Sequence, residues 1–145
     1  MSAEQNKALM RRMVEEIFNQ GNMDMLGEFM APEYVEREKL PPGVASDREG
    51  AKRMTVMLRK AFPDFKATIE DIIAEGDKVV VRMTWSGTQT GKFMGIPPTG
   101  KSVSFGVIDI LRFSGDKMVE HWGIPDRLAM MQQLGVFPAP GDGEG

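Results

Sequence analysis

The chain has a single histidine, and it stands in a segment whose residue types could carry acid–base chemistry. This segment predicts a strand that leads into a short helix over 127–134, and it reads Glu120-His121-Trp122-Gly123-Ile124-Pro125-Asp126. The 145 residues include no cysteine, so a thiol nucleophile, a disulfide and a Cys/His zinc site are excluded. If the protein is an enzyme without a cofactor, its proton transfers must use carboxylates and His121.

Asp126, at the junction of strand and helix, has two interpretations. As the residue before a helix it could be an N-cap, which stabilises a helix by about 1 kcal/mol. In an apolar pocket near Trp122 it could instead take a proton from a substrate and later return one. Neighbouring residues of a strand point to opposite faces, so His121 and Trp122 lie on different faces of it. The sequence leaves open which of these two faces meets the pocket.

Two further acids are candidate catalytic groups. Asp109 interrupts a predicted strand of alternating apolar side chains, and it could pair with Arg82 or hydrogen-bond an enolate as a neutral acid. Glu38 follows a short predicted strand over 34–37 at the expected pocket mouth. It belongs either to a solvated cluster of charges over 36–39 or to the catalytic set.

Several large apolar side chains could bind a substrate or simply fill the core. The candidates for the pocket wall are Phe18, Met54, Trp85, Phe93 and Trp122. The chain also contains 13 methionines, whose flexible thioethers suit either a core or an adaptable wall around an apolar ligand.

Composition narrows the class of protein. The length of 145 residues and the 41% apolar content suit one domain with a core. A net charge of −3 argues against nucleic acid as a partner. No apolar run is long enough for a membrane helix, and the N-terminus is too polar for a signal peptide, so a cytoplasmic protein is expected.

The hydrophobic pattern changes period along the chain. A period of 3.6 predicts helices over 3–19 and 23–30, and a helix beginning at Ser46 with a capping box to Glu49. A period of two then predicts strands over 65–75, 78–88, 102–113 and 117–124. This order predicts an α+β domain over 1–137, with a curved, mostly antiparallel sheet wrapped around the helices, and a disordered tail over 138–145.

Four motifs carry a resemblance to a known family: Gly87-Thr88-Gln89-Thr90-Gly91, Gly95-Ile96-Pro97-Pro98-Thr99-Gly100-Lys101, Ile108-Asp109-Ile110-Leu111-Arg112-Phe113, and the 120–126 segment with Gln133-Leu134-Gly135. Over about residues 5–136 the chain resembles the SnoaL-like polyketide cyclases, or ester cyclases, of the NTF2-like superfamily. The resemblance implies an α+β cone with a deep apolar pocket, a homodimer, and an intramolecular aldol condensation without metal or cofactor. By motif position it makes Asp126 the acid/base.

A second resemblance, to the ketosteroid isomerases of the same superfamily, involves other positions. It places Asp109 at their oxyanion-hole acid and Glu38 at their catalytic base. Val14 stands where those enzymes have an oxyanion-hole tyrosine, and Glu36-Arg37-Glu38 stands where SnoaL-like proteins often have a histidine.

The sequence therefore predicts an enzyme that acts on a small apolar carbonyl compound through an enolate. Asp126 is the expected base and then acid, with Asp109, His121 and Glu38 as helpers. The alternatives are an epoxide hydrolase or isomerase/dehydratase in the same pocket, and a non-catalytic module for small-molecule binding or dimerisation.

Overall fold

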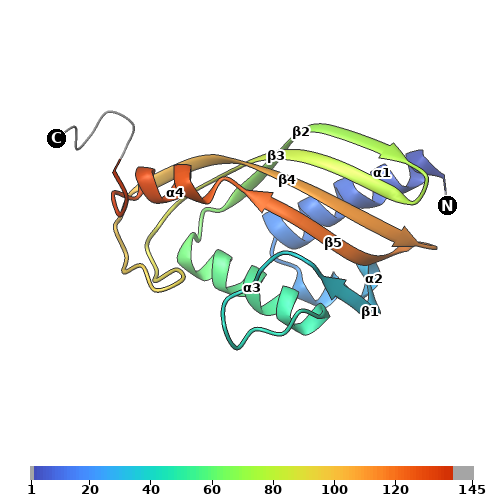
Figure 1. Ribbon diagram of the computed structural model, residues 1–145, viewed down its shortest axis with the longest axis horizontal. Coiled ribbons are helices and arrows are strands. Elements are labelled where there is room, and N and C mark those ends of the chain that lie inside the picture. Colours follow the sequence, from blue (N-terminus) through green and yellow to red (C-terminus); the bar gives the residue numbers. More distant parts are fainter. Residues whose placement is uncertain (1, 139–145) are drawn as a thin grey trace.

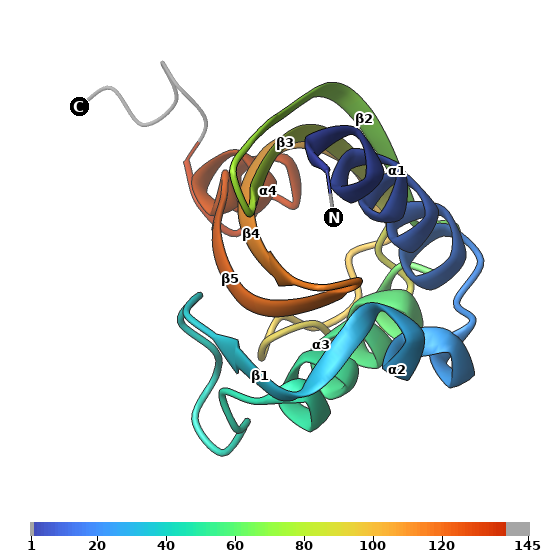
Figure 2. The same cartoon turned by 90° about the vertical axis from the view of Figure 1, so that its right-hand side faces the viewer.

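A strongly curved five-stranded sheet forms the wall of the molecule. The computed structural model describes residues 2–138, and it contains strands β1 Met30–Glu36, β2 Lys66–Glu75, β3 Lys78–Thr88, β4 Ser102–Ser114 and β5 Lys117–Pro125. The strands lie in the order β1-β5-β4-β3-β2. All neighbours are antiparallel except β1, which runs parallel to β5. Figures 1 and 2 show the sheet curling around the helices, as the sequence predicts.

The helices close the concave side of the sheet. They are α1 Ala3–Met13, α2 Leu26–Phe29, α3 Arg48–Ala61 and α4 Arg127–Gln133. Helix α1 begins with a capping box between Ser2 and Gln5 and continues into a π-helical segment, Val14–Asn19. Gly21 then follows this helical run with φ +72°, the left-handed backbone that commonly ends a helix. Together these elements give an α+β cone.

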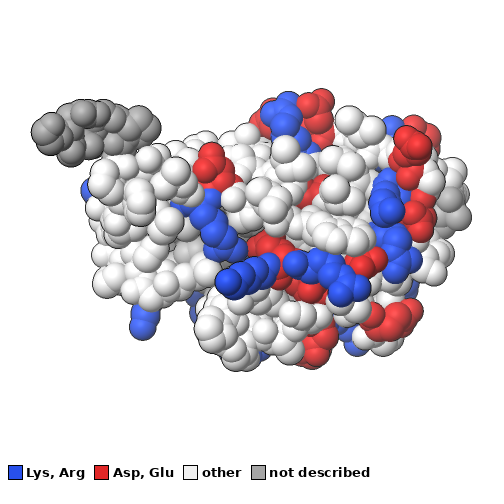
Figure 3. Space-filling view, in the orientation of Figure 1, with Lys and Arg blue, Asp and Glu red and all other residues white. Residues whose placement is uncertain are grey.

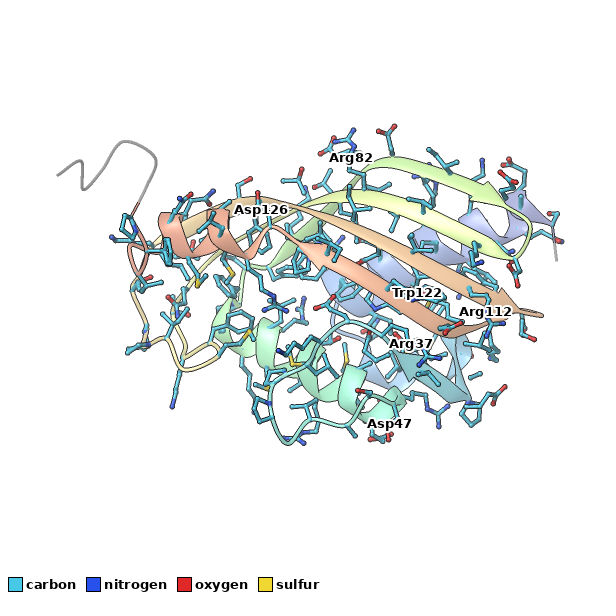
Figure 4. The ribbon with its side chains drawn as sticks, in the orientation of Figure 1. Arg37, Asp47, Arg82, Arg112, Trp122 and Asp126 are labelled. Atoms are coloured by element: carbon cyan, nitrogen blue, oxygen red, sulfur yellow. The ribbon has the colours of Figure 1, made fainter. Side chains whose placement is uncertain are left out.

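The start of α3 differs from the sequence prediction. Asp47, and not Ser46, is the N-cap, and its Oδ1 accepts a hydrogen bond of 2.9 Å from the Gly50 amide (Figure 4). The backbone carbonyl of Ser46 instead accepts a hydrogen bond of 3.0 Å from the Glu36 amide. The segment before α3 is thus bonded to β1 directly before the helix begins.

Side chains of β4 alternate between the core and the outer face. Val103, Phe105, Val107, Asp109, Leu111 and Phe113 are all buried, as the period of two predicts. On β5 the same alternation puts His121 and Gly123 beside the core and Trp122 and Ile124 on the outer face. The face of His121 therefore meets the interior.

Strand β1 is longer than predicted and extends from Met30 through Pro32 to Glu36. Pro32 cannot continue the preceding helix, and an edge strand tolerates its missing amide donor. The register pairs Val35 with Glu120 and Glu36 with His121. This pairing brings an acid from the first third of the chain beside the histidine.

Within residues 2–138, no helix is long and apolar enough to cross a membrane. Apart from Pro138, the tail predicted over 138–145 lies outside the described residues.

Candidate active site

An apolar cavity lies between the concave face of the sheet and the helices. Its empty volume is about 930 Å³, counted with the open space at its mouth. The structure places Phe18, Met54, Trp85 and Phe93 in the wall, with methionines from α1 around them. The polar groups of the wall are few and lie together, as in a small-molecule site.

His121 is held between two carboxylates on the wall of this cavity. Its Nδ1 lies 2.5 Å from Glu36 Oε2, and its Nε2 lies 2.9 Å from Asp109 Oδ1. Both acids are buried, with exposed fractions of 7% for Glu36 and 5% for Asp109. Three strands thus meet at one imidazole: β1, β4 and β5.

Glu36 is the residue that sequence reasoning missed. The sequence places it in a cluster of solvated charges, yet its Oε1 accepts a 2.9 Å hydrogen bond from the Tyr34 hydroxyl and its Oε2 accepts one of 3.1 Å from the Glu38 amide. The alternation of Tyr34, Glu36 and Glu38 along an extended segment was the available signal. This alternation indicates a buried site only when it is known that one face of β1 is buried.

Opposing effects act on the pKa of His121. Burial alone lowers it, but the hydrogen bonds to Asp109 and Glu36 and the negative charges of both acids outweigh burial and raise the pKa to about 10. The imidazole is therefore a cation at neutral pH and donates from both nitrogens. Burial, together with the neighbouring carboxylate Glu36, also raises the pKa of Tyr34.

Glu38 stands beside this cluster at the cavity wall. Burial raises its pKa to about 7; the His121 cation opposes that rise, while Asp109 and Glu36 add to it. Arg127 donates a hydrogen bond of 3.1 Å to Glu38 Oε2. A carboxyl group that titrates near neutrality can both accept and return a proton.

Gly123 makes room for the polar cluster. A Cβ built on Gly123 would lie 2.4 Å from Glu38 Oε1, 2.6 Å from Asp109 Oδ1 and 2.8 Å from His121 Nε2. The three groups therefore converge over the bare backbone of one residue, and any side chain there would push them apart.

Asp126 lies elsewhere, which corrects the expectation that it lines the pocket. Its Oδ1 accepts a hydrogen bond of 3.0 Å from the Ala129 amide and caps α4 (Figure 4). Its neighbours Pro125 and Arg127 line the cavity, while Asp126 is not among the lining residues. The strand places alternate residues on opposite faces, so Asp126 points away from the interior.

Trp122 is likewise outside the cavity, in contrast to the expectation that it binds substrate. It lies on the outer face of β5, next to Glu120 in the chain (Figure 4). Glu120 is held there by Arg37 at 2.7 Å and Arg112 at 2.9 Å. Figure 3 shows basic and acidic atoms mixed in a band across the middle of this side of the molecule.

Arg82 also lies on the outer face, and it is not the partner of Asp109. Its guanidinium binds Asp71 Oδ2 at 2.7 Å, between β3 and β2. In the β3–β4 register Arg82 is opposite Ile108, an outward residue, which places it on the other side of the sheet from Asp109. The expected pairing of Asp109 with Arg82 is therefore wrong, and Asp109 pairs with His121 instead.

The geometry of Glu38, Asp109 and His121 would admit a cation, since one donor atom from each lies within 4.8 Å of the others. Each of these donors already has another partner in the structure. The His121 Nε2 that would bind a metal carries a proton shared with Asp109, and Glu38 is paired with Arg127. We therefore interpret the cluster as a proton-transfer site and do not identify these residues as metal ligands.

Comparisons with known proteins agree with this architecture. The family profile described as SnoaL-like polyketide cyclase matches residues 8–134. The nogalonic acid methyl ester cyclase of Streptomyces nogalater is 27% identical over 86% of this chain and 93% of its own. The aklanonic acid methyl ester cyclase DnrD of Streptomyces peucetius is 33% identical over 91% of this chain and 92% of its own.

A solved structure shares the fold. TsrD from Streptomyces laurentii superposes with a TM-score of 0.85 at 31% identity, covering 94% of this chain and 99% of that one. The curved sheet, its helical cover and the interior cavity define an NTF2-like α+β protein of the cyclase type. Within that class, the chain belongs to the SnoaL-like polyketide cyclase family.

We expect the imidazole of His121 to titrate near pH 10 and not near its ordinary 6.5. Because the chain has one histidine, its ring nitrogens give one unambiguous pair of ¹⁵N signals for an NMR titration. The raised pKa also means that the bound proton stabilises the fold fully below pH 6.5, and this contribution is lost as the pH rises through 10.

The corresponding loss of unfolding free energy is at most about 1.4 kcal/mol per pH unit in that window. In His121→Gln the unfolding free energy, measured by urea denaturation at a series of pH values, should lose the component of the imidazole between pH 6.5 and 10. A midpoint for His121 near the ordinary value would contradict the assignment of the cation.

We expect Gly123→Ala to destabilise the fold by about 1–3 kcal/mol, because the new methyl group would overlap three polar atoms. Gly106→Ala is the matched control on the neighbouring strand β4, since a Cβ there would meet nothing within 4 Å. Urea denaturation measures both. Equal effects of the two substitutions would show that the cluster does not require the space over Gly123.

Proposed function

We propose that the protein is a cyclase that closes a ring in an uncharged, apolar, polyketide-like carbonyl compound. The observation that carries this proposal is a carboxyl group that titrates near neutrality, Glu38, beside the His121 cation in an apolar cavity. The names of the relatives support an ester as the substrate. The cavity also suits an uncharged ester, because both cations of its described wall, His121 and Arg127, are already paired with carboxylates.

The reaction we propose is an intramolecular aldol condensation. The Glu38 carboxylate removes the proton from the carbon next to a carbonyl group, and the electron pair of that C–H bond forms an enolate. The enolate carbon then attacks a ketone carbon of the same molecule, and the C=O π pair moves to oxygen as an alkoxide. Glu38 returns the proton to that alkoxide, so the product is an isomer of the substrate.

The other polar groups would act by charge and position. The His121 cation lies beside Glu38, where it stabilises negative charge on the enolate and alkoxide. Asp109 and Glu36 hold both nitrogens of the imidazole, so the ring cannot turn. The apolar wall excludes water, which strengthens these electrostatic effects.

Two substitutions separate Glu38 from Asp126 as the acid/base. We expect Glu38→Gln to lower kcat with aklanonic acid methyl ester by about 10²–10⁴-fold, the usual contribution of a general base. Asp126→Asn should leave kcat unchanged, because asparagine caps a helix as well as aspartate does. A loss of kcat in Asp126→Asn but not in Glu38→Gln would instead assign the acid/base role to Asp126.

The pH profile tests the same assignment without substitution. Because the pKa of Glu38 is raised to about 7 and its ionised form is the base, kcat/KM should rise with pH through a midpoint near 7. This limb should be absent from the residual activity of Glu38→Gln. A profile that is flat across neutrality would exclude Glu38 as the base.

We also propose that the protein is a homodimer, which forms through the outer face of β4 and β5. Ile108 and Ile124 are cross-strand partners there and are 48% and 77% exposed, and Leu128 of α4 is 50% exposed nearby in the chain. Such a group of apolar side chains on an outer face is typical of an interaction surface.

We expect Ile124→Lys to convert a dimer to a monomer in sedimentation velocity. Ile73→Lys is the matched control, since Ile73 is 63% exposed but lies on the edge strand β2. A monomeric native protein, or dissociation by the control alone, would contradict this surface.

A further inference from the structure

Arg127 lines the cavity and contacts two segments of the chain that the chemistry proposed above does not connect. Its Nη2 donates to Glu38 Oε2 at 3.1 Å, and its Nη1 lies 3.1 Å from the Met94 sulfur. Arg127 is the first residue of α4 and directly follows the N-cap Asp126, whose side chain binds the Ala129 amide and holds this turn in place. One guanidinium thus joins the segment after β1 to the connection between β3 and β4.

The Met94 side of this bridge is a tight turn. Phe93 and Ile96 exchange two backbone hydrogen bonds, of 3.0 and 2.8 Å. Between them Met94 has φ +48° and Gly95 has φ +84°, which is the left-handed backbone of a two-residue hairpin turn. We call residues 93–96 the mouth turn, because Phe93 lines the cavity while Met94 at the tip is 38% exposed.

The base of the mouth turn is anchored away from Arg127. The fully buried Gln89 donates from Nε2 to the Ile96 carbonyl at 3.1 Å, and Phe93 packs edge-on against Phe62 at 5.5 Å between ring centroids. The amides of Thr90 and Gly91 both bind the Ala61 carbonyl at the end of α3. The contact between Met94 and Arg127 therefore connects the tip of the turn to Glu38.

The Glu38 side of the bridge is crowded with charge. Glu36 of β1, Asp109 of β4 and His121 of β5 surround Glu38, with the Tyr34 hydroxyl behind Glu36. Arg127 is the cation that α4 contributes, and its side chain is 35% exposed against 20% for Glu38. When Glu38 is ionised it attracts the guanidinium; when Glu38 takes up a proton that attraction weakens.

We propose that Arg127 is a positioning residue that joins Glu38 to the mouth turn, so that the charge on Glu38 sets how firmly Met94 is held at the cavity. Proton uptake by Glu38 frees the guanidinium from one partner and loosens the tip of the turn. The turn is thereby tighter when the base is ready to react and looser once it has taken the proton. The functional meaning rests on the proposed role of Glu38, but the coupling itself does not depend on any turnover.

NMR on the free protein tests this coupling directly. Methionine ¹³C-methyl labelling follows Met94, with Met94→Leu to assign its signal, and ¹³C-carboxyl labelling follows Glu38, with Glu38→Gln to assign it. In the native protein we expect the Met94 methyl shift to titrate with the same midpoint as Glu38, near 7. His121, whose pKa is raised to about 10, stays charged across that range.

Two substitutions of Arg127 separate its contacts. Arg127→Gln removes the charge, so the Glu38 midpoint should rise by roughly one unit and the Met94 response should vanish. Arg127→Lys keeps the charge but has one ammonium group in place of a two-pronged guanidinium. It should hold the Glu38 midpoint close to that of the native protein and still lose the Met94 response.

Arg82→Gln is the matched control, because Arg82 pairs with Asp71 on the outer face of the sheet. It should leave both titrations unchanged, and the signals of the buried methionines Met10, Met83 and Met118 report that each variant is folded. A Met94 signal that ignores the ionisation of Glu38, or a Glu38 midpoint that Arg127→Gln does not move, would overturn the proposal. An unchanged kcat in Glu38→Gln, together with the expected coupling in the native protein, would overturn the proposed cyclase chemistry and leave the coupling standing.

Discussion

The site depends on one buried ion cluster, in which His121 lies between Glu36 and Asp109. Each member alone would be costly inside the core, because an unpaired buried charge loses its hydration. Together they satisfy both ring nitrogens, and the sum of their hydrogen bonds and charges keeps the imidazole protonated. Because β1, β4 and β5 each supply one member, the cluster also specifies how the edge strand β1 docks on the sheet.

The raised pKa of Glu38 follows from this cluster and the cavity together. Burial disfavours its ionised form, and the cation of His121 partly offsets that effect. Asp109 and Glu36 keep the imidazolium largely neutralised, so Glu38 is not driven to an ordinary low pKa. The apolar wall and the ion cluster thus together produce a carboxyl group that can exchange a proton near neutrality.

The position of Asp126 illustrates the limit of inference from a motif. Its place in the chain matched the family acid/base, and its residue type also matched a helix cap. A strand that ends at Pro125 leaves Asp126 on the outer side, where its Oδ1 accepts a hydrogen bond from the amide of Ala129. Pro125 and Arg127, the residues on either side, line the cavity instead. A shift of one residue along a strand reverses the face, so residue type and spacing could not decide between the two roles.

The sequence by itself determined the α+β class, the strands β2 to β5 and the buried face of β4, because these follow from hydrophobic period and from glycine turns. It also singled out His121, Asp109 and Glu38. Only the tertiary structure decided that Glu36 and Arg127 belong with them and that Asp126 and Trp122 do not. The physical reason is that the pairing of β1 with β5 joins residues 85 positions apart, and the buried side of an edge strand depends on that pairing. Local periodicity over seven residues of β1 carries no information about which partner covers it.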